Sequence, residues 1–483
     1  MTRISSELAD KREPGVGSFR RAFTVLVVVL VVLCAVFVTL GYLQGPELAD
    51  AQVDTQAVTS QSGQQLRLFA NQPIAEISAD QVTVTPEAQV SVTTAGDVIA
   101  VQFDTPLNYA TDYVVRVEGV RSTSLPQEGA FEYRFTTGSP QLFYLDRNPD
   151  GPDQILRTTL AGPESTTVHS DDRILEFAVV GQALAVLSLE PDDTTTLELV
   201  SLTDGAVEEL LMPEPGRISD LSASTVGFTV GFVFTPDATA ADPLGGRQLL
   251  VVDLNLGRAL TPVAGLDGEP LVVADWQFVP GSTRLVAQSS EQTMLLVETS
   301  EVSAAGEGDA DGAGATPGIP TPLGQFDSLE GFTKDGSTMV VRDAFGAISV
   351  SLVDGSETRF EPSLVEGGPP FIGDVQPLSN GWMVEKAALQ TDSGAFIVLL
   401  AVDDGTSGRV LYVTPDAAGS IESFGVSPND QLIVAEVVPD ISATVSDGYP
   451  GDPRSTTVTT LLIDVMTGAI VRTLEGIGVQ FAG

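Results

Sequence analysis

The chain of 483 residues has only one cysteine, Cys34, and only one histidine, His169. Cys34 lies within a long apolar run, so the rest of the chain has no cysteine for a disulfide, a thiol nucleophile or a cysteine-bound metal. A single histidine excludes a zinc site built from several histidines and leaves one candidate base for a catalytic triad. We interpret His169, in the polar sequence TTVHSDD, as a surface loop residue.

Positive charge is also scarce. Lys and Arg number 23 against 65 Asp and Glu, which gives a net charge of −42. A phosphate backbone would be repelled by this charge, so we expect no nucleic acid as a partner. Blocks of like charge, which would favour an acidic docking face, are absent, and we interpret the acidity as a solvated surface. The glycine motifs that bind phosphate are absent as well.

One apolar run stands out near the N-terminus. Residues 22–43, AFTVLVVVLVVLCAVFVTLGYL, contain no charge over 22 positions, and a helix of that length is about 33 Å long, enough to span a bilayer. Acidic residues follow the run, whereas the residues that precede it include Arg3, Lys11, Arg12, Arg20 and Arg21. The positive-inside rule therefore predicts a cytoplasmic tail over residues 1–21, a single-pass transmembrane helix over residues 22–43, and extracytoplasmic domains beyond it.

A cleaved signal peptide is the alternative for this region. The small residues at positions 49–51, ADA, form a cleavage pattern, and RRAF at positions 20–23 resembles a twin-arginine export signal. Apolar regions of signal peptides are usually about 7 to 15 residues long, so we favour an uncleaved anchor. Lipid attachment at Cys34 is less favoured, because bulky Leu33 precedes it.

The segment after the anchor changes from polar to alternating. Residues 44–63 are polar, with Pro46 and no apolar period, and predict a stalk. Over residues 64–138, apolar and polar residues alternate in short segments separated by turns: LRLFA, VTVTP, VSVTT, VIAVQF, YVVRVEGV and FEYRFTT. This pattern predicts an antiparallel β-sandwich.

The same stretch resembles a known family. NQPI after the first strand, the spacing of Leu107, Thr111, Tyr113, Val115 and Val117, and the closing YRFTTG resemble the bacterial Ig-like domain of the S-layer-protein type, over about residues 61–137. The resemblance implies a spacer or adhesive module rather than a catalyst. In a sandwich of this kind Tyr113 would anchor a strand corner through its hydroxyl.

A loose repeat follows over residues 139–483. Pairs of apolar residues three positions apart recur at intervals of 43 to 56 residues, the length of a four-stranded propeller blade with variable loops. The pairs are Ile174/Phe177, Ile218/Leu221, Val273/Trp276, Leu329/Phe332, Ile372/Val375 and Ile421/Phe424. The aligned sequences VADWQFVPGSTRLVA and IESFGVSPNDQLIVA resemble the repeat of β-propellers of the TolB and WD40-like kind.

The two ends of this region complement each other. QLFYLDRNPDGPDQILRTTL has the pattern of the second hairpin of a blade without the first hairpin, and GIGVQFAG has the pattern of a first strand without its partners. Joined, they would close the ring and leave no exposed edge. We expect seven blades, with six or eight as alternatives. Residues 303–322 are rich in Gly, Ala and Pro and predict a flexible insertion within a blade.

The predicted fold class is therefore an all-β ectodomain, an Ig-like sandwich plus a β-propeller, behind one N-terminal transmembrane helix. In this combination the chain resembles membrane-anchored envelope proteins of bacteria, and of actinobacteria in particular.

The sequence DRNPDG offers one candidate metal site. The first, third, fifth and sixth positions of a calcium loop would be Asp146, Asn148, Asp150 and Gly151. The Glu that an EF-hand places at the twelfth position is Arg157 here, the Asp that integrin-type propeller loops place at the ninth is Gln154, and Asp153 comes one residue early. Asn, Pro, Asp and Gly also suit a hairpin turn, so we favour a plain turn and keep calcium as the alternative. No other cofactor is expected.

Catalytic residues cannot be named from the sequence. A pair of carboxylates could act on glycans, but 65 acidic residues identify no pair. Asp275 and Trp276 resemble a sugar-binding pair, yet Trp276 occupies the apolar position of the repeat, which favours core packing.

We accordingly expect a membrane-anchored, extracytoplasmic binding or scaffold protein without catalytic activity, whose propeller engages an envelope protein or a cell-wall polymer. The alternatives are a carboxylate-dependent hydrolase or lyase of cell-wall glycan, and a sensory accessory of a membrane signalling complex.

The topology can be tested directly. Protease added to intact protoplasts should digest the ectodomain and leave an N-terminal tag protected, because the basic tail is expected to stay in the cytoplasm. Recovery of the protein only as a soluble secreted form would show instead that the apolar run is a cleaved signal.

Overall fold

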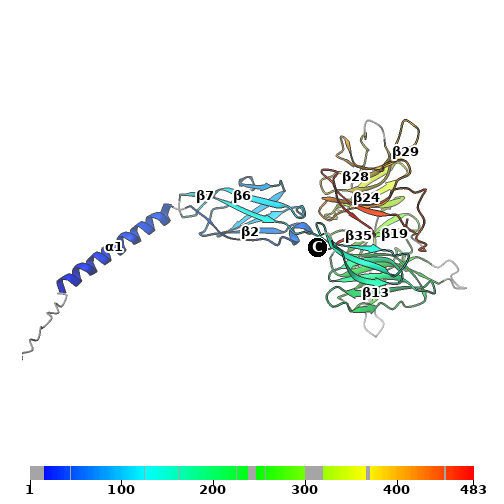
Figure 1. Cartoon of the computed structure of the whole chain (residues 1–483), viewed down its shortest axis with the longest axis horizontal. Helices are drawn as coiled ribbons and strands as arrows, with labels where there is room; N and C mark the ends of the chain where they lie inside the picture. The colour runs from blue at the N-terminus through cyan, green and yellow to red at the C-terminus, as the bar shows by residue number, and fades with distance from the viewer. Residues whose placement is uncertain are drawn as a thin grey trace, which may run out of the picture. The chain divides into compact units, whose positions relative to one another are not determined.

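The structure is a computed structural model that describes residues 16–43, 45–124, 126–162, 164–224, 226–237, 246–255, 257–299, 319–365, 370–450 and 453–482. It begins with helix α1 (Val16–Leu43) and continues almost entirely as strands (Figure 1). The strands form two compact units. The first unit includes Gln65–Asp104 and Asp112–Phe135, and the second comprises Thr55–Gln64, Thr105–Thr111 and Thr136–Gly483.

Helix α1 contains the apolar run and begins six residues before it, so Val16–Arg21 of the predicted tail is helical. Residues 1–15 of that tail lie outside the described residues. Among the residues described, no helix combines the length and the apolar character that crossing a membrane requires.

The first unit is built from two antiparallel sheets. One sheet has the order β1 (Leu48–Gln52), β2 (Gln65–Ala70), β5 (Val98–Phe103), β4 (Val90–Ala95), and the other has the order β3 (Val82–Thr85), β6 (Asp112–Arg121), β7 (Glu128–Thr136). Alternation of apolar residues buries one face of each sheet: Leu66, Leu68 and Phe103 on the first, and Val115 and Phe131 on the second. The predicted sandwich architecture is thus observed.

Two predictions from the sequence concern residues 44–63 and Tyr113. The predicted stalk over residues 44–63 is partly wrong, because Leu48–Gln52 forms strand β1 and pairs with β2, and Ala57–Thr59 forms a short 3-10 helix. The polar, poorly alternating sequence of β1 is that of an exposed edge strand, which needs little apolar surface. Tyr113 is buried and its ring stacks on Phe135 with centroids 5.8 Å apart.

Seven four-stranded antiparallel sheets make up the second unit. We number them as blades. The composite blade 1 has β35 (Ile477–Ala482), β8 (Gln141–Asp146), β9 (Asp153–Thr159) and β10 (Thr166–Asp171). Blade 2 has β11 (Ile174–Val180), β12 (Ala183–Leu189), β13 (Thr195–Ser201) and β14 (Val207–Glu209), and blade 3 has β15 (Gly216–Ala223), β16 (Thr229–Pro236), β17 (Gln248–Asp253) and β18 (Leu260–Pro262).

The other four blades follow in chain order. Blade 4 has β19 (Val273–Phe278), β20 (Arg284–Ser289), β21 (Thr293–Glu298) and β22 (Thr321–Gln325), and blade 5 has β23 (Ser328–Phe332), β24 (Thr338–Asp343), β25 (Gly346–Ser351) and β26 (Glu357–Arg359). Blade 6 has β27 (Phe371–Pro377), β28 (Met383–Gln390), β29 (Phe396–Asp403) and β30 (Gly408–Val413), and blade 7 has β31 (Ser420–Val426), β32 (Leu432–Val438), β33 (Thr459–Asp464) and β34 (Ile470–Leu474).

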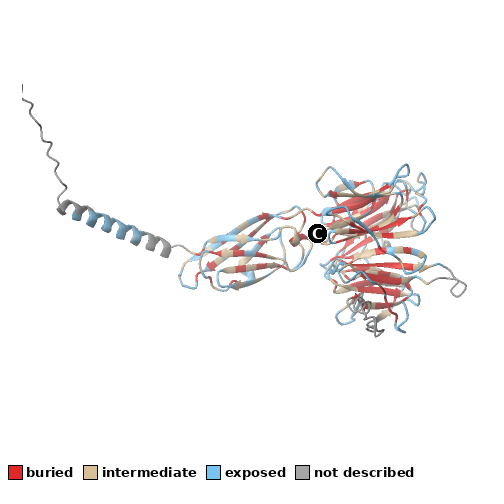
Figure 2. Cartoon of the chain, turned by 90° about the horizontal axis from the view of Figure 1, so that it is seen from below, coloured by how far each residue is buried: buried red, intermediate tan, exposed pale blue. Residues whose placement is uncertain are grey.

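The composite blade closes the ring. Strand β35 pairs antiparallel with β8, with Ile477 opposite Leu145 and Phe481 opposite Leu142. Apolar clusters then join every blade to the next, including blade 7 to blade 1 and blade 1 to blade 2. Figure 2 shows these buried positions in the blades and exposed positions at the loops. The prediction of seven blades closed by the last strand is confirmed.

The repeat and the insertion can now be placed. Each of the six apolar pairs lies in the first strand of its blade, from β11 to β31, as the repeat predicted. The predicted insertion at residues 303–322 is too long, because Thr321 and Pro322 belong to β22, the outermost strand of blade 4. Residues 303–318 of that insertion lie outside the described residues.

The predicted boundary at residue 138 is too simple, since two earlier segments belong to the second unit. Leu107 N donates to Val58 O (2.7 Å), and Asn429 Nδ2 donates to Leu107 O (2.9 Å). Tyr109 is buried, and its ring stacks on Phe481 of β35 with centroids 6.0 Å apart. These segments therefore pack where blades 7 and 1 meet.

Removal of residues 477–483 tests the closure. Strand β8 of blade 1 would then have an unpaired edge, and apolar surface between blades 7 and 1 would be exposed, so we expect loss of the cooperative transition and aggregation. Both tryptophans, Trp276 and Trp382, lie in the second unit, and their fluorescence during urea unfolding reports on the propeller alone.

A chain lacking only Gly483 keeps every pairing of β35 and is the matched control. If the longer truncation unfolded at the same urea concentration as this control, closure by β35 would not hold the ring together.

Candidate functional site

The first strands of the blades carry an acidic residue at a common place. In blades 2 to 7 these residues are Glu176, Asp220, Asp275, Glu330, Asp374 and Glu422. In each strand the pairing register with the second strand shifts at this acid, which marks a β-bulge. The acids follow the first apolar residue of each repeat by one or two positions, a signal that was present in the sequence and that the sequence analysis missed.

Two of these carboxylates form hydrogen bonds with the backbone of the next blade. Glu176 of blade 2 accepts hydrogen bonds from the backbone N of Asp220 (3.0 Å) and Leu221 (2.7 Å) of blade 3. Glu330 of blade 5 likewise accepts one from Val375 N (3.2 Å) of blade 6. A bulge leaves a backbone N–H without a partner in its own sheet, so the acid of one blade satisfies the bulge of the next.

Basic side chains compensate four of the six acids. The ion pairs are Asp220 with Arg247, Glu330 with Arg342 (2.8 Å), Asp374 with Lys386 (2.9 Å) and Glu422 with Arg454 (3.7 Å). Burial raises the pKa of Asp275, although the hydrogen bond from Trp276 N (2.7 Å) opposes this shift. Glu176 and Glu330 thus link neighbouring blades, whereas each of these four ion pairs lies within one blade.

A cavity of about 590 Å³ opens beside blade 1. It is lined by residues 145–149, 151, 172, 173, 447, 449, 454–459 and 475–477. These residues come from the loops between the second and third strands of blades 1 and 7 and from the connections that enter β11 and β35. Both kinds of connection leave an antiparallel blade at the same end, so one face of the propeller carries the cavity. We call it the loop face.

Tyr449 and two arginines form the wall of this cavity. The guanidinium carbons of Arg147 and Arg173 lie 4.1 and 4.4 Å from the centre of the Tyr449 ring, a cation–π arrangement. Arg147 also forms an ion pair of 2.7 Å with Asp447, and the two side chains are only 7% and 10% exposed. Because such a pair has lost most of its water, its geometry is tightly determined.

Asp153 connects this wall to the turn between β8 and β9, which contains the candidate calcium residues. The Tyr449 hydroxyl donates to Asp153 Oδ2 (2.5 Å), and the backbone N of Ile174 (2.7 Å) and of Asn148 (2.9 Å) donate to the same carboxylate. Burial, and then the hydrogen bond to Asp153, raise the pKa of Tyr449 to about 12, so the phenol remains a donor at neutral pH.

The candidate calcium residues lie in and beside the turn between β8 and β9. Asn148 Oδ1 accepts a hydrogen bond from Asp150 N (3.0 Å), and Asp150 is exposed. Asp146 ends β8, and burial raises its pKa, as do the neighbouring Asp153 and Glu475. The carboxylate on which the turn depends is that of Asp153, the residue that the sequence analysis set aside for coming one position early.

Two other residues weighed from the sequence can be placed. Trp276 is buried in the cluster between blades 3 and 4, so its expected role in core packing is confirmed. The interpretation of His169 as a loop residue is wrong, because it lies in strand β10 and is half-buried. TTVHSD is polar because β10 is the outermost strand of its blade, and polar sequence alone does not separate such a strand from a loop.

Large apolar side chains are exposed on the loop face of blades 5 and 6. Phe345 is 85% exposed, Phe371 63%, Leu364 60% and Phe396 46%. The rings of Phe371 and Phe396 meet edge to face with centroids 5.4 Å apart. Arg359 lies over the Phe345 ring at 5.8 Å. Isolated exposed apolar residues are common, but three exposed aromatic rings on adjacent blades are the pattern of an interaction surface.

No protein-family model matches the chain, and no curated protein matches it. Among solved structures, the chain is similar to a putative 6-phosphogluconolactonase from Bacteroides fragilis (13% identity, 71% of this chain and 98% of the other, TM-score 0.41) and to TolB from Acinetobacter baumannii (12% identity, 82% of each chain, TM-score 0.35).

It is also similar to the Cps50 (Swd1) β-propeller domain from Myceliophteria thermophila (13% identity, 63% of this chain and 90% of the other, TM-score 0.35). The seven closed sheets themselves define the class: the chain is an all-β protein with a seven-bladed propeller. Its solved structural neighbours include TolB.

Asp153→Ala tests the role of the buried carboxylate. The change leaves the two backbone N–H groups and the Tyr449 hydroxyl without their acceptor, so we expect a loss of about 2–4 kcal/mol in the free energy of unfolding. Urea unfolding followed by tryptophan fluorescence measures it. Asp150→Ala, in the same turn but exposed, is the control and should change stability by less than about 0.5 kcal/mol.

The same loop should show no strong response to calcium, since hydrogen bonds within the turn already hold it. Thermal melts of the protein in chelator and in millimolar calcium should then coincide, because a ligand that binds only the folded state raises the melting temperature by mass action. A large rise with calcium that Asp146→Ala or Asp150→Ala abolishes would establish the calcium site instead.

Proposed function

We propose that the protein is a membrane-anchored, extracytoplasmic binding or scaffold protein without catalytic activity, which uses the loop face of its propeller to hold another protein of the cell envelope. The exposed aromatic residues of blades 5 and 6 are the observation that carries this proposal.

Aromatic side chains on an otherwise strongly acidic protein favour a protein partner over a polymer of charged groups. Phe345 and Phe371 lose little conformational entropy when they are covered, because each side chain has only two rotatable bonds, and each buries a large apolar area. Arg359, over the Phe345 ring and paired with Asp343 (2.6 Å), adds a charged group beside the apolar centre. Aromatic and arginine side chains dominate the energetics of protein interfaces.

The inner-strand acids support a non-catalytic role. A glycan hydrolase needs one carboxyl group that is free to donate a proton and a second that is free to act as base or nucleophile. Glu330, Asp374 and Asp220 are instead held in ion pairs, and Glu176 is occupied by two backbone N–H groups. These contacts explain the carboxylates as structural groups, which form ion pairs within a blade or, for Glu176, hydrogen bonds to the next blade.

The anchor rests on the sequence, through the uncharged run at residues 22–43 and the basic residues before it. Cleavage at the alternative site, residues 49–51, would cut through strand β1, which pairs with β2. This supports retention of the N-terminal segment. The first unit then acts as an Ig-like spacer between membrane and propeller, as its resemblance to S-layer-type domains of bacterial envelope proteins implies.

Site-specific photocrosslinking in living cells tests the loop face. A benzophenone amino acid at Phe345 of the full-length chain should capture one protein in a defined ratio, and mass spectrometry identifies it. Val353 is the matched control, because it is 84% exposed and lies at the opposite end of strand β25 in the same blade. The probe at Val353 should capture much less of that protein.

Phe345→Ser and Phe371→Ser together should reduce co-purification of the captured protein by more than about tenfold, because each buried aromatic anchor contributes about 2 kcal/mol or more to an interface. Val353→Ser should leave it unchanged. Equal capture at both positions would argue against the loop face, and turnover of cell-wall glycan by the purified full-length protein would overturn the non-catalytic assignment.

A further inference from the structure

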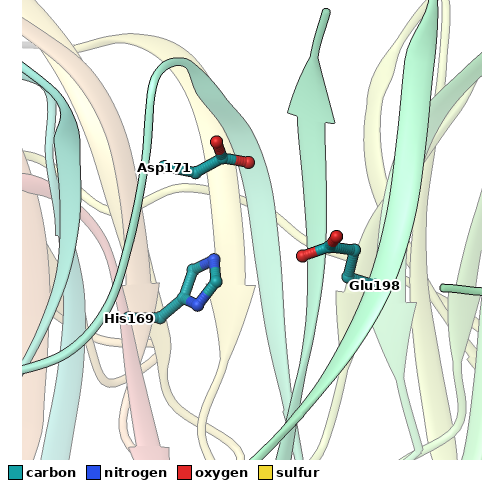
Figure 3. Close-up of side chains that lie close together, drawn as sticks. All are labelled: His169, Asp171 and Glu198. Carbon is teal, nitrogen blue, oxygen red and sulfur yellow. The ribbon is translucent and has the colours of Figure 1, made fainter. Parts of the chain in front are cut away.

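A cluster of three side chains lies between blade 1 and blade 2, apart from the loop-face cavity. His169 and Asp171 belong to β10, the outermost strand of blade 1, and Glu198 belongs to β13, the third strand of blade 2. One nitrogen or oxygen atom from each lies within 4.8 Å of those from the other two. Figure 3 shows the imidazole and the two carboxylates turned toward a common space.

The backbone directs these side chains. The pairing of β10 with β9 shifts register between Thr167 and His169, and a bulge of this kind re-aims the side chain that follows it. On β13, Leu197 and Leu199 are buried against blade 3, so Glu198 between them faces the opposite way, toward blade 1.

The imidazole lacks a partner of its own. His169 Nε2 is buried and has no hydrogen-bond partner among the described residues. An imidazole nitrogen removed from water without a partner costs free energy, which a hydrogen bond or a metal ion at that position would recover.

The charges around the cluster are all of one sign. Glu198 lies directly opposite Glu209 of β14, and the carboxylates of Asp171, Glu209 and Glu190 interact unfavourably with that of Glu198. Like charges directly opposite each other in a sheet are destabilising. In the described part of the chain, no Lys or Arg forms an ion pair with any of these four carboxylates. The site therefore has negative charge that a cation would compensate.

We propose that His169, Asp171 and Glu198 bind a divalent transition-metal ion such as Zn²⁺, which links the outer strand of blade 1 to blade 2. One imidazole and two carboxylates suit such an ion, whereas Ca²⁺ and Mg²⁺ prefer oxygen ligands alone. One oxygen of Asp171 accepts a hydrogen bond from Asp172 N (2.7 Å), which orients this carboxylate from behind.

The ion has a structural consequence. Blade 1 is assembled from both ends of the propeller sequence, and β10 is its outermost strand. An ion held by ligands from β10 and β13 fastens that strand to the neighbouring blade. Because the ligands come together only in the folded protein, bound metal raises the stability of the propeller.

The test uses the full-length protein purified in detergent, stripped with a chelator and dialysed, then titrated with ZnCl₂ in a calorimeter. We expect one equivalent of Zn²⁺ to bind at micromolar or lower concentration and the melting temperature of the propeller to rise with added Zn²⁺. Mn²⁺ should bind at the same place and Ca²⁺ at millimolar concentration should not compete.

Three variants identify the ligands. His169→Gln and Glu198→Gln should each weaken Zn²⁺ binding at least tenfold, since loss even of outer-shell partners costs about 10- to 100-fold. Glu209→Gln removes a neighbouring charge but no ligand, and should change the affinity less than threefold. Circular dichroism of each stripped variant confirms that it is folded.

The results separate the alternatives. Equal weakening by Glu209→Gln and Glu198→Gln would mean non-specific attraction of cations by surface charge and would overturn the proposal. So would Zn²⁺ binding that survives His169→Gln, or absence of binding at 100-fold excess over about 1 μM protein.

Discussion

The pairing of β35 with β8 is the contact on which the propeller depends. Residues about 330 positions apart in the chain meet in one antiparallel ladder, and only then does each of the seven blades have a neighbour on both sides. The apolar clusters between blades follow from this closure, because a blade with an open face would leave side chains such as Phe143 and Leu142 in water. The inner-strand carboxylates add a second connection, since Glu176 and Glu330 each reach the backbone of the next blade.

The closed ring fixes the positions of the loops that form the loop face. The closed sheets hold the strand ends in place, so the loops that project from them can carry groups that a folding core would not tolerate. Arg147 and Asp447 come from different blades and form a nearly dry ion pair there, and Phe345 and Phe371 remain exposed on two adjacent blades. Polar groups of the cavity wall pair with one another, as Arg147 does with Asp447, whereas the aromatic side chains of blades 5 and 6 are exposed. For this reason we propose that the exposed aromatic residues of blades 5 and 6 bind the partner.

Features of the fold that depend on neighbouring residues could be predicted from the sequence, whereas contacts between residues far apart in the chain could not. Alternation and turn residues are local, so the strands, the seven blades and the burial of Trp276 could be predicted. The closing strand could be predicted because the region begins with a hairpin that lacks its preceding partners and ends with a first strand that lacks its following ones. The polar strands β1 and β10 were missed, since an edge strand needs few apolar residues. The hydrogen bond between Tyr449 and Asp153, and the proximity of His169 to Glu198, bring together residues that are distant in the sequence, and no local pattern predicts them.

The residues of the propeller unit are not continuous in the sequence. Thr55–Gln64 and Thr105–Thr111 precede most of the first unit or interrupt it, yet they pack as part of the propeller, where Tyr109 stacks on Phe481 and Leu107 accepts a hydrogen bond from Asn429. One continuous segment that begins at residue 139 would therefore not contain the complete propeller. A gene fusion that began at residue 139 would leave Phe481 and Asn429 without these partners, although each unit has its own core.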